Sequence, residues 1–193
     1  MDSYQSVLPV AEKEKIFFLT LSGAPVVLKR SAQQSPLVFS TWCNLELEVE
    51  LLLKQRQRDN RKKVILAFDQ DPFFQIVRTS ILKRSSSFGL EIVSDNTFDL
   101  NGSDFRSMLV ASSKAGADCA LMGFGSESNL LTFLKQRKEL RPALTLYGTD
   151  CLDGYISQRE WVSLFENGSW PPRECVTQTS LTSIEPVTRS ILF

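Results

Sequence analysis

The chain has 193 residues, of which 42% are hydrophobic and 23% charged, as is typical of a soluble globular protein with a core. Its 22 basic and 22 acidic residues cancel, so no overall field favours nucleic acid or an anionic membrane. Histidine is absent, which excludes histidine-dependent catalytic triads and imidazole metal sites.

The first 60 residues alternate predicted helices and strands. A short helix is expected over residues 3–13, a buried strand over 16–21 (IFFLTL) and an extended run over 36–42 (PLVFSTW). A strong helix follows over 44–59, with Asn44 as its N-cap. The apolar faces predicted for the two helices comprise Val7, Val10 and Ala11 in the first, and Leu45, Val49, Leu52 and Leu53 in the second.

Residues 62–150 predict three strand–helix units and a closing strand. The expected strands are KKVILAFD, LEIVSDNTF, DCALMG and ALTLYG, and the segments between them have helical spacing. Asp71 and Pro72 form a helix N-cap and first-turn pair, and Phe105, Leu109 and Val110 form the face of a later helix. This alternation predicts an α/β fold, an open parallel sheet with helices on both faces in three layers, of the flavodoxin or Rossmann type.

The pattern after residue 150 is weaker. It predicts a last helix over 158–166 and a strand over 174–180, and it assigns no structure to the tail. Ligands of parallel sheets bind beyond the carboxyl ends of the strands. The candidate site is therefore formed by the loops 69–73, 123–128 and 148–153.

Two observations bear on the cellular compartment and on metal binding. The N-terminus lacks the basic and apolar regions of a signal peptide, so we expect either a cytoplasmic protein or the mature or trimmed form of an exported one. The four cysteines are widely spaced and form no C-x-x-C pair, which argues against zinc, and Cys119 is expected to be a buried apolar residue.

The order of these segments resembles a known family. The segments that carry the resemblance are, in order, VVLKRSAQQSPLVFSTW, a helix, KKVILAFDQDPFFQ, a long helix, GLEIVSDNTF, DCALMGFGSESNLLTFLKQRKEL and ALTLYGTD. In this order they resemble type I periplasmic substrate-binding proteins. The likeness is strongest to the branched-chain amino-acid (Leu/Ile/Val) receptors of ABC transporters. It implies a periplasmic or extracellular binding protein rather than an enzyme, with a small amino-acid-like solute, a membrane permease as partner, and no cofactor or metal.

Such receptors are much longer and have two lobes. Residues 1–40 look like the last βα unit of lobe one with its crossover, and residues 41–193 look like lobe two, with 171–193 unassigned. The serine-bearing loop of lobe one that helps to hold the ligand's α-carboxylate has no counterpart here. We therefore expect weak or undetectable binding by this chain alone, because half a cleft offers few contacts.

The resemblance also implies which residues contact the solute. The turn at residues 22–24 would hold the α-carboxylate and α-amine, Asp150 would face the ammonium, and three phenylalanines would line the side-chain pocket. The predicted ligand-binding residues are Ser22, Gly23, Ala24, Asp71, Phe73, Phe74, Phe124, Gly125 and Asp150. A helix N-terminus capped by Ser126 or Ser128 could bind an anion there. An ordinary turn, core aromatics and a solvated aspartate stay as alternatives for these residues.

Two other functions stay open. Asp69, Asp71 and Asp150 at three strand ends would suit Mg²⁺ in a flavodoxin-like nucleotide-binding domain or enzyme, although the sequence has no P-loop and no triple-glycine motif. A truncated lobe that binds no solute could instead form homo-oligomers through an apolar face left bare by the missing lobe.

Overall fold

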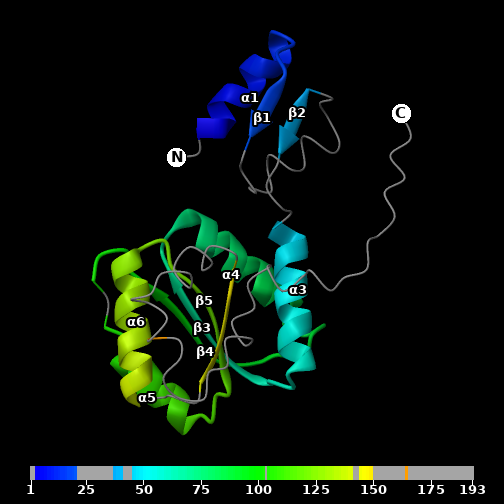
Figure 1. Cartoon of the computed structure of the whole chain (residues 1–193). Helices are drawn as coiled ribbons and strands as arrows, with labels where there is room; N and C mark the ends of the chain where they lie inside the picture. The colour runs from blue at the N-terminus through cyan, green and yellow to red at the C-terminus, as the bar shows by residue number, and fades with distance from the viewer. Residues whose placement is uncertain are drawn as a thin grey trace. The chain divides into compact units, whose positions relative to one another are not determined.

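A computed structural model describes residues 3–20, 37–40, 45–102, 104–140, 144–149 and 164. The chain divides into two compact units, residues 1–51 and 52–193 (Figure 1). The elements in chain order are α1 (Ser3–Lys13), β1 (Phe18–Thr20), β2 (Val38–Ser40), α3 (Leu45–Arg58), β3 (Lys63–Asp69), α4 (Pro72–Arg84), β4 (Glu91–Phe98), α5 (Arg106–Lys114), β5 (Cys119–Gly123), α6 (Glu127–Leu140) and β6 (Thr145–Gly148). Apart from Leu164, the helix and strand predicted over 158–166 and 174–180 lie outside the described residues.

The first unit contains α1 and a parallel pair of short strands, β1 and β2. The predicted helix is confirmed, and its predicted apolar face is right for Ala11 but wrong for Val7 and Val10. Leu8 and Ala11 are buried, and Leu8 packs with Val38 of β2, whereas Val7 and Val10 are exposed. Leu8 and Ala11 have the same helical spacing as Val7 and Val10, so the sequence pattern does not decide which face the strands cover.

The two short strands are buried on one side only. Phe18 packs inward, whereas Phe17, Leu19 and Phe39 are exposed, and the rings of Phe17 and Phe39 stack with centroids 5.1 Å apart. The sequence predicts that the strand over 16–21 is buried, and this prediction is wrong for the side that carries Phe17 and Leu19. The strand positions themselves are confirmed.

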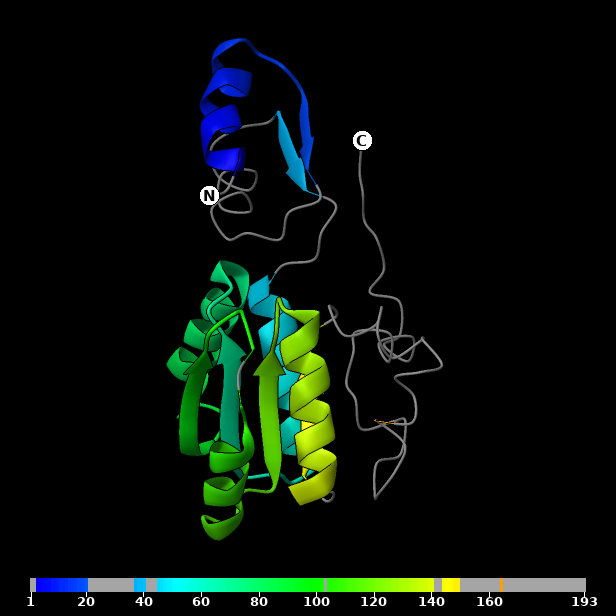
Figure 2. The same cartoon turned by 90° about the vertical axis from the view of Figure 1, so that its left-hand side faces the viewer.

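The second unit is built on a four-stranded sheet in the order β4-β3-β5-β6, and every neighbouring pair is parallel. All strands therefore end at one edge, as the arrowheads in Figure 2 show. Helices α5 and α6 cover one face, and α4 covers the other beside the part of α3 from Leu52 onward (Figure 1). The α/β fold predicted from the sequence is confirmed.

The two central strands carry the core of this unit. Apart from Lys63, every residue of β3 and β5 is buried, as expected for parallel strands covered on both faces. Cys119 is one of them, and burial raises the pKa of its thiol above the usual value. Among the described residues, no helix is both long and apolar enough to span a membrane.

A local capping signal accounts for the start of α4 but not for that of α5. Asp71 caps α4, where its carboxylate accepts from the backbone N–H groups of Phe73 at 2.8 Å and Phe74 at 3.4 Å, as predicted. Helix α5 begins at Arg106, and the side chain at its N-cap position, Phe105, makes no capping hydrogen bond. The N–H of Phe105 instead donates to Gln136 Oε1 of α6, 2.7 Å away.

The predicted face of α5 is right for Leu109, which is fully buried, and wrong for Val110, which is 42% exposed. We expect Leu109→Ala to lower the free energy of unfolding by about 2–4 kcal/mol, because it leaves a cavity in the core. Val110→Ala should cost less than about 0.5 kcal/mol. Urea denaturation of both variants measures the difference, and equal losses would contradict the orientation of α5.

Candidate functional site

The loops predicted from the sequence meet at the carboxyl edge of the sheet. Strand β3 ends at Asp69, and β5, its neighbour, ends at Gly123, so the loops 69–73 and 123–128 emerge side by side. The turn 22–24 and Asp150 lie outside the described residues, and of the third predicted loop only Gly148 and Thr149 are described.

Asp69 joins the two loops. Its side chain is fully buried, and its two carboxylate oxygens accept from different backbone amides. One oxygen accepts from the N–H of Asp71 at 3.2 Å, and the other accepts from the N–H of Ser126 at 3.0 Å. Gln75 of α4 adds a third bond to the first loop, from its Nε2 to the Asp69 carbonyl at 2.6 Å. The relative position of the two loops is therefore fixed by one carboxylate.

Two glycines allow the loops to approach this closely. A Cβ atom on Gly125 would lie 2.8 Å from Asp71 Oδ2, and one on Gly123 would lie 2.3 Å from Cδ1 of Phe74. Both distances are too short for a side chain to be accommodated without movement of its neighbour. The predicted residues Asp71 and Gly125 are thus brought into contact across the two loops.

The predicted aromatic residues fall into two groups. Phe73 is half-buried and its ring meets that of Phe74 edge-on, with centroids 5.3 Å apart. Phe74 is buried beneath Gly123. Phe124 is buried in the core, where its ring lies 5.5 Å from that of Phe105 and 5.4 Å from that of Phe133. Only Phe73 of the three is both part of the loop edge and partly accessible.

The start of α6 settles which serine caps that helix. Ser126 Oγ accepts from the N–H of Asn129 at 3.4 Å, so Ser126 is the N-cap. Asn129 is buried, and its Nδ2 donates to the Asp99 carbonyl at 2.7 Å, which ties the β4–α5 loop to the same edge. The sequence analysis missed Asn129, although a polar residue at a buried position in the first turn of a helix is a usable signal.

The charge of this edge is negative. The loop sequences DQDPFF, DLNG and GFGSES contain three aspartates and a glutamate but no lysine or arginine. The next aspartate, Asp104, is paired with Arg106. The Ser126 N–H at the start of α6, which could have held an anion, already donates to Asp69. The edge is therefore better suited to a cationic group than to an anionic one.

The described part of the chain gives no support to a metal site here. Among its residues, no group of three or more Asp, Glu, Cys or His side chains could hold a metal ion. Asp69, which was one candidate ligand for Mg²⁺, uses both carboxylate oxygens for backbone amides.

Comparison with known proteins identifies relatives of the fold. No protein-family model matches the chain, and no curated protein sequence matches it either. Among solved structures, the solute-binding protein of an ABC transporter from R. palustris in complex with benzoate matches with a TM-score of 0.63 and 17% identity, over 84% of this chain and 43% of that chain. A periplasmic ligand-binding protein of a branched-chain amino-acid ABC transporter from Burkholderia xenovorans matches with a TM-score of 0.61 and 16% identity, over 74% of this chain and 38% of that chain.

A third match is the leucine-, isoleucine-, valine-, threonine- and alanine-binding protein from Brucella ovis, with a TM-score of 0.58 and 11% identity, over 84% of this chain and 48% of that chain. The chain thus has the fold of one lobe of a type I periplasmic solute-binding protein, as the sequence resemblance predicted. It spans less than half the length of these three proteins, all of which are named as binding proteins.

The role of Asp69 can be tested without a ligand. We expect Asp69→Ala to lower the free energy of unfolding by about 1–3 kcal/mol, because it leaves two backbone N–H groups without an acceptor. Gln70→Ala, at an exposed neighbouring side chain, should change it by less than about 0.5 kcal/mol. Chemical denaturation measures both, and an unchanged stability for Asp69→Ala would show that the loops are held together by other contacts.

Proposed function

We propose that this chain is a solute-binding module of the ABC-transporter receptor kind, and that it contributes one side of a site for a small amino-acid-like solute. The observation that carries the proposal is the pair of loops joined by Asp69 at the carboxyl edge of a sheet with this fold. Ligands of open α/β sheets bind at this edge. The proposed function is binding rather than catalysis.

Among the described residues, we assign direct contact with the solute to Asp71, Phe73 and Gly125. Asp71 offers a half-buried carboxylate, Phe73 offers a partly accessible ring, and Gly125 lets a ligand approach the backbone. Phe74 and Phe124 support the loops from beneath, because both side chains are buried in the interior. The turn 22–24 and Asp150 keep their proposed roles at the α-carboxylate and the ammonium.

The charge of the edge favours a solute that carries an ammonium group. The named relatives include one protein in complex with benzoate and others named for amino acids. A lone carboxylate such as benzoate would be repelled by the carboxylate of Asp71, which faces the solute, and by the buried charge of Asp69 behind it, whereas an ammonium group would be attracted to both charges. The acidic edge therefore supports an amino acid rather than an aromatic acid.

The proposal includes partners. Because the chain spans less than half of its structural relatives, a complete cleft requires a second lobe, and the exposed Phe17, Leu19 and Phe39 are apolar surface that could be covered by it or by a second copy of this chain. In the receptor family, the complete protein acts outside the cytoplasm and delivers its solute to a membrane permease, and we propose the same setting here.

A titration followed by ¹⁵N–¹H NMR tests the proposal even at weak affinity. We expect millimolar leucine to shift the amide resonances of residues 71–73 and 125–126, and benzoate to shift them less. Asp71→Asn should weaken leucine binding by about threefold to tenfold, since it removes the charge but keeps a side chain that caps α4 equally well.

Gln70→Ala is the matched control, and it should leave the affinity unchanged because that exposed side chain lies outside the proposed contacts. A folded protein whose edge resonances do not respond to any amino acid would refute solute binding by this chain. Stronger binding of benzoate than of leucine at the same residues would refute the preference for an ammonium group.

A further inference from the structure

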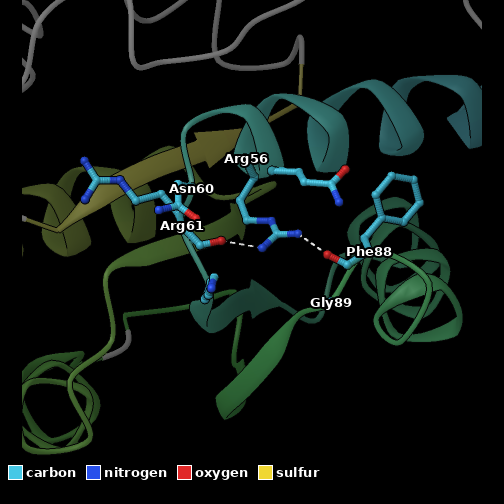
Figure 3. Close-up of a pocket in the computed structure, with 7 residues that line it drawn as sticks. Arg56, Asn60, Arg61, Phe88 and Gly89 are labelled. Atoms are coloured by element: carbon cyan, nitrogen blue, oxygen red, sulfur yellow. Dashed lines mark hydrogen bonds between the residues drawn. The ribbon is translucent and has the colours of Figure 1, made fainter.

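A pocket of about 170 Å³ lies at the amino edge of the same sheet, opposite the edge described above. It is formed by the end of α3, the loop from α3 to β3, and the loop from α4 to β4 (Figure 3). The residues that line it are Arg56, Gln57, Asn60, Arg61, Lys62, Phe88 and Gly89. Three of the seven are cationic, two carry amides, and none is acidic.

The end of α3 gives the pocket a defined backbone. Asn60 adopts a left-handed conformation with φ 54°, and its N–H donates to the Gln57 carbonyl at 3.0 Å. The N–H of Arg61 donates to the Arg56 carbonyl at 3.2 Å. These two bonds form a Schellman motif, which ends the helix and directs the chain into β3.

Arg56 is the central residue of the pocket. Its side chain is only 2% exposed, and its guanidinium donates from Nη1 to the Arg61 carbonyl and from Nη2 to the Phe88 carbonyl (Figure 3). Its Nε is buried and has no hydrogen-bond partner. Arg56 therefore holds the two loops together, and its Nε has no exposed surface through which a ligand in the pocket could reach it.

The cations of the pocket have no carboxylate partners among the described residues. None of the salt bridges among the described residues involves Arg56 or Lys62. Arg56 is buried, whereas the Lys62 side chain is exposed. A guanidinium that is buried without a counter-charge is costly unless an anion or water compensates it.

The two nearby acids have other partners. Asp59 accepts from the Tyr147 hydroxyl at 2.6 Å and from Gln55 Nε2 at 2.9 Å. Burial and this bond to Asp59 raise the pKa of Tyr147, which therefore keeps its proton and continues to donate. Asp118 accepts from the N–H groups of Lys62 at 2.9 Å and Lys63 at 3.3 Å, through one oxygen, while its other oxygen is buried without a partner. Neither acid lines the pocket.

We propose that this pocket binds a small oxyanion of the phosphate class, as a second site separate from the proposed solute site. The Lys62 ammonium, the Arg61 guanidinium and the side-chain amides of Gln57 and Asn60 can all donate to such an ion, whose oxygens only accept, and the buried charge of Arg56 adds to the positive field of the pocket. The pocket has room for a phosphate-sized ion or several water molecules. The free ion and the phosphoryl group of a monoester present the same oxygens, and the experiment below distinguishes them.

An NMR titration of the full chain with inorganic phosphate, at constant ionic strength in chloride, tests this inference. We expect saturable shifts of the amide resonances of residues 60–62 and 88–89. Lys62→Gln should weaken the apparent affinity by about tenfold, because it removes one charged donor without touching the backbone bonds to Asp118. Lys135→Gln, at an exposed lysine of α6 outside the pocket, should bind phosphate as the unaltered chain does.

The same titration with glycerol phosphate distinguishes the free ion from a monoester. Binding as strong as that of inorganic phosphate would show that the pocket accepts a phosphoryl group, and no binding would show that it accepts only the free ion. Shifts that never saturate, or that are the same in Lys62→Gln and Lys135→Gln, would overturn the proposal, because they would show only general ionic effects on a charged surface. Leucine binding at the opposite edge is measured separately, so either site can fail without the other.

Discussion

The buried carboxylate of Asp69 is the constraint on which the candidate site depends. It stands at the end of the central strand β3, where parallel strands deliver two loops to the same edge, and it accepts one hydrogen bond from each loop. Backbone N–H groups at such a place need an acceptor, and in many parallel sheets a bound anion supplies it. Here that anion is the Asp69 carboxylate, which accepts from the Ser126 N–H and so fixes the two loops. It also occupies the place where an anionic ligand would otherwise bind.

The distribution of charge along the sheet follows largely from helix geometry. Helices of a parallel α/β unit begin near the carboxyl edge of the sheet and end near its amino edge, so acidic residues at the first edge and basic residues at the second both complement the helix dipoles. Arg84 and Lys114, at the ends of α4 and α5, are ordinary examples. Arg56 differs from these two because it is buried, a feature that it shares with Arg137 in the last turn of α6. The basic character of the edge therefore does not single out a binding site; what distinguishes this place is the pocket between the α3–β3 and α4–β4 loops, with cations and amides in its lining and no acid.

The sequence predicted the parts of the fold that depend on local pattern, and it failed where packing decides. The strand–helix alternation and the cap at Asp71 were readable because hydrophobic spacing and capping chemistry are local. The exposure of Val110 and the burial of Phe124 depend on which elements pack against them, and neither spacing nor composition carries that information. The contact between Asp69 and Ser126 joins residues 57 positions apart, so it requires the register of β3 against β5.

Because the two loops are joined within this unit, the site edge does not depend on a second lobe for its shape. A ligand bound at this edge alone would leave its opposite side in water, and the lost contacts lower affinity more than any rearrangement of the loops would. A second lobe would then add contacts and exclude water from Asp71 and Phe73, which strengthens the attraction between a carboxylate and an ammonium group. Weak binding by this chain alone and stronger binding by a two-lobed receptor are both what we expect of such a preformed edge.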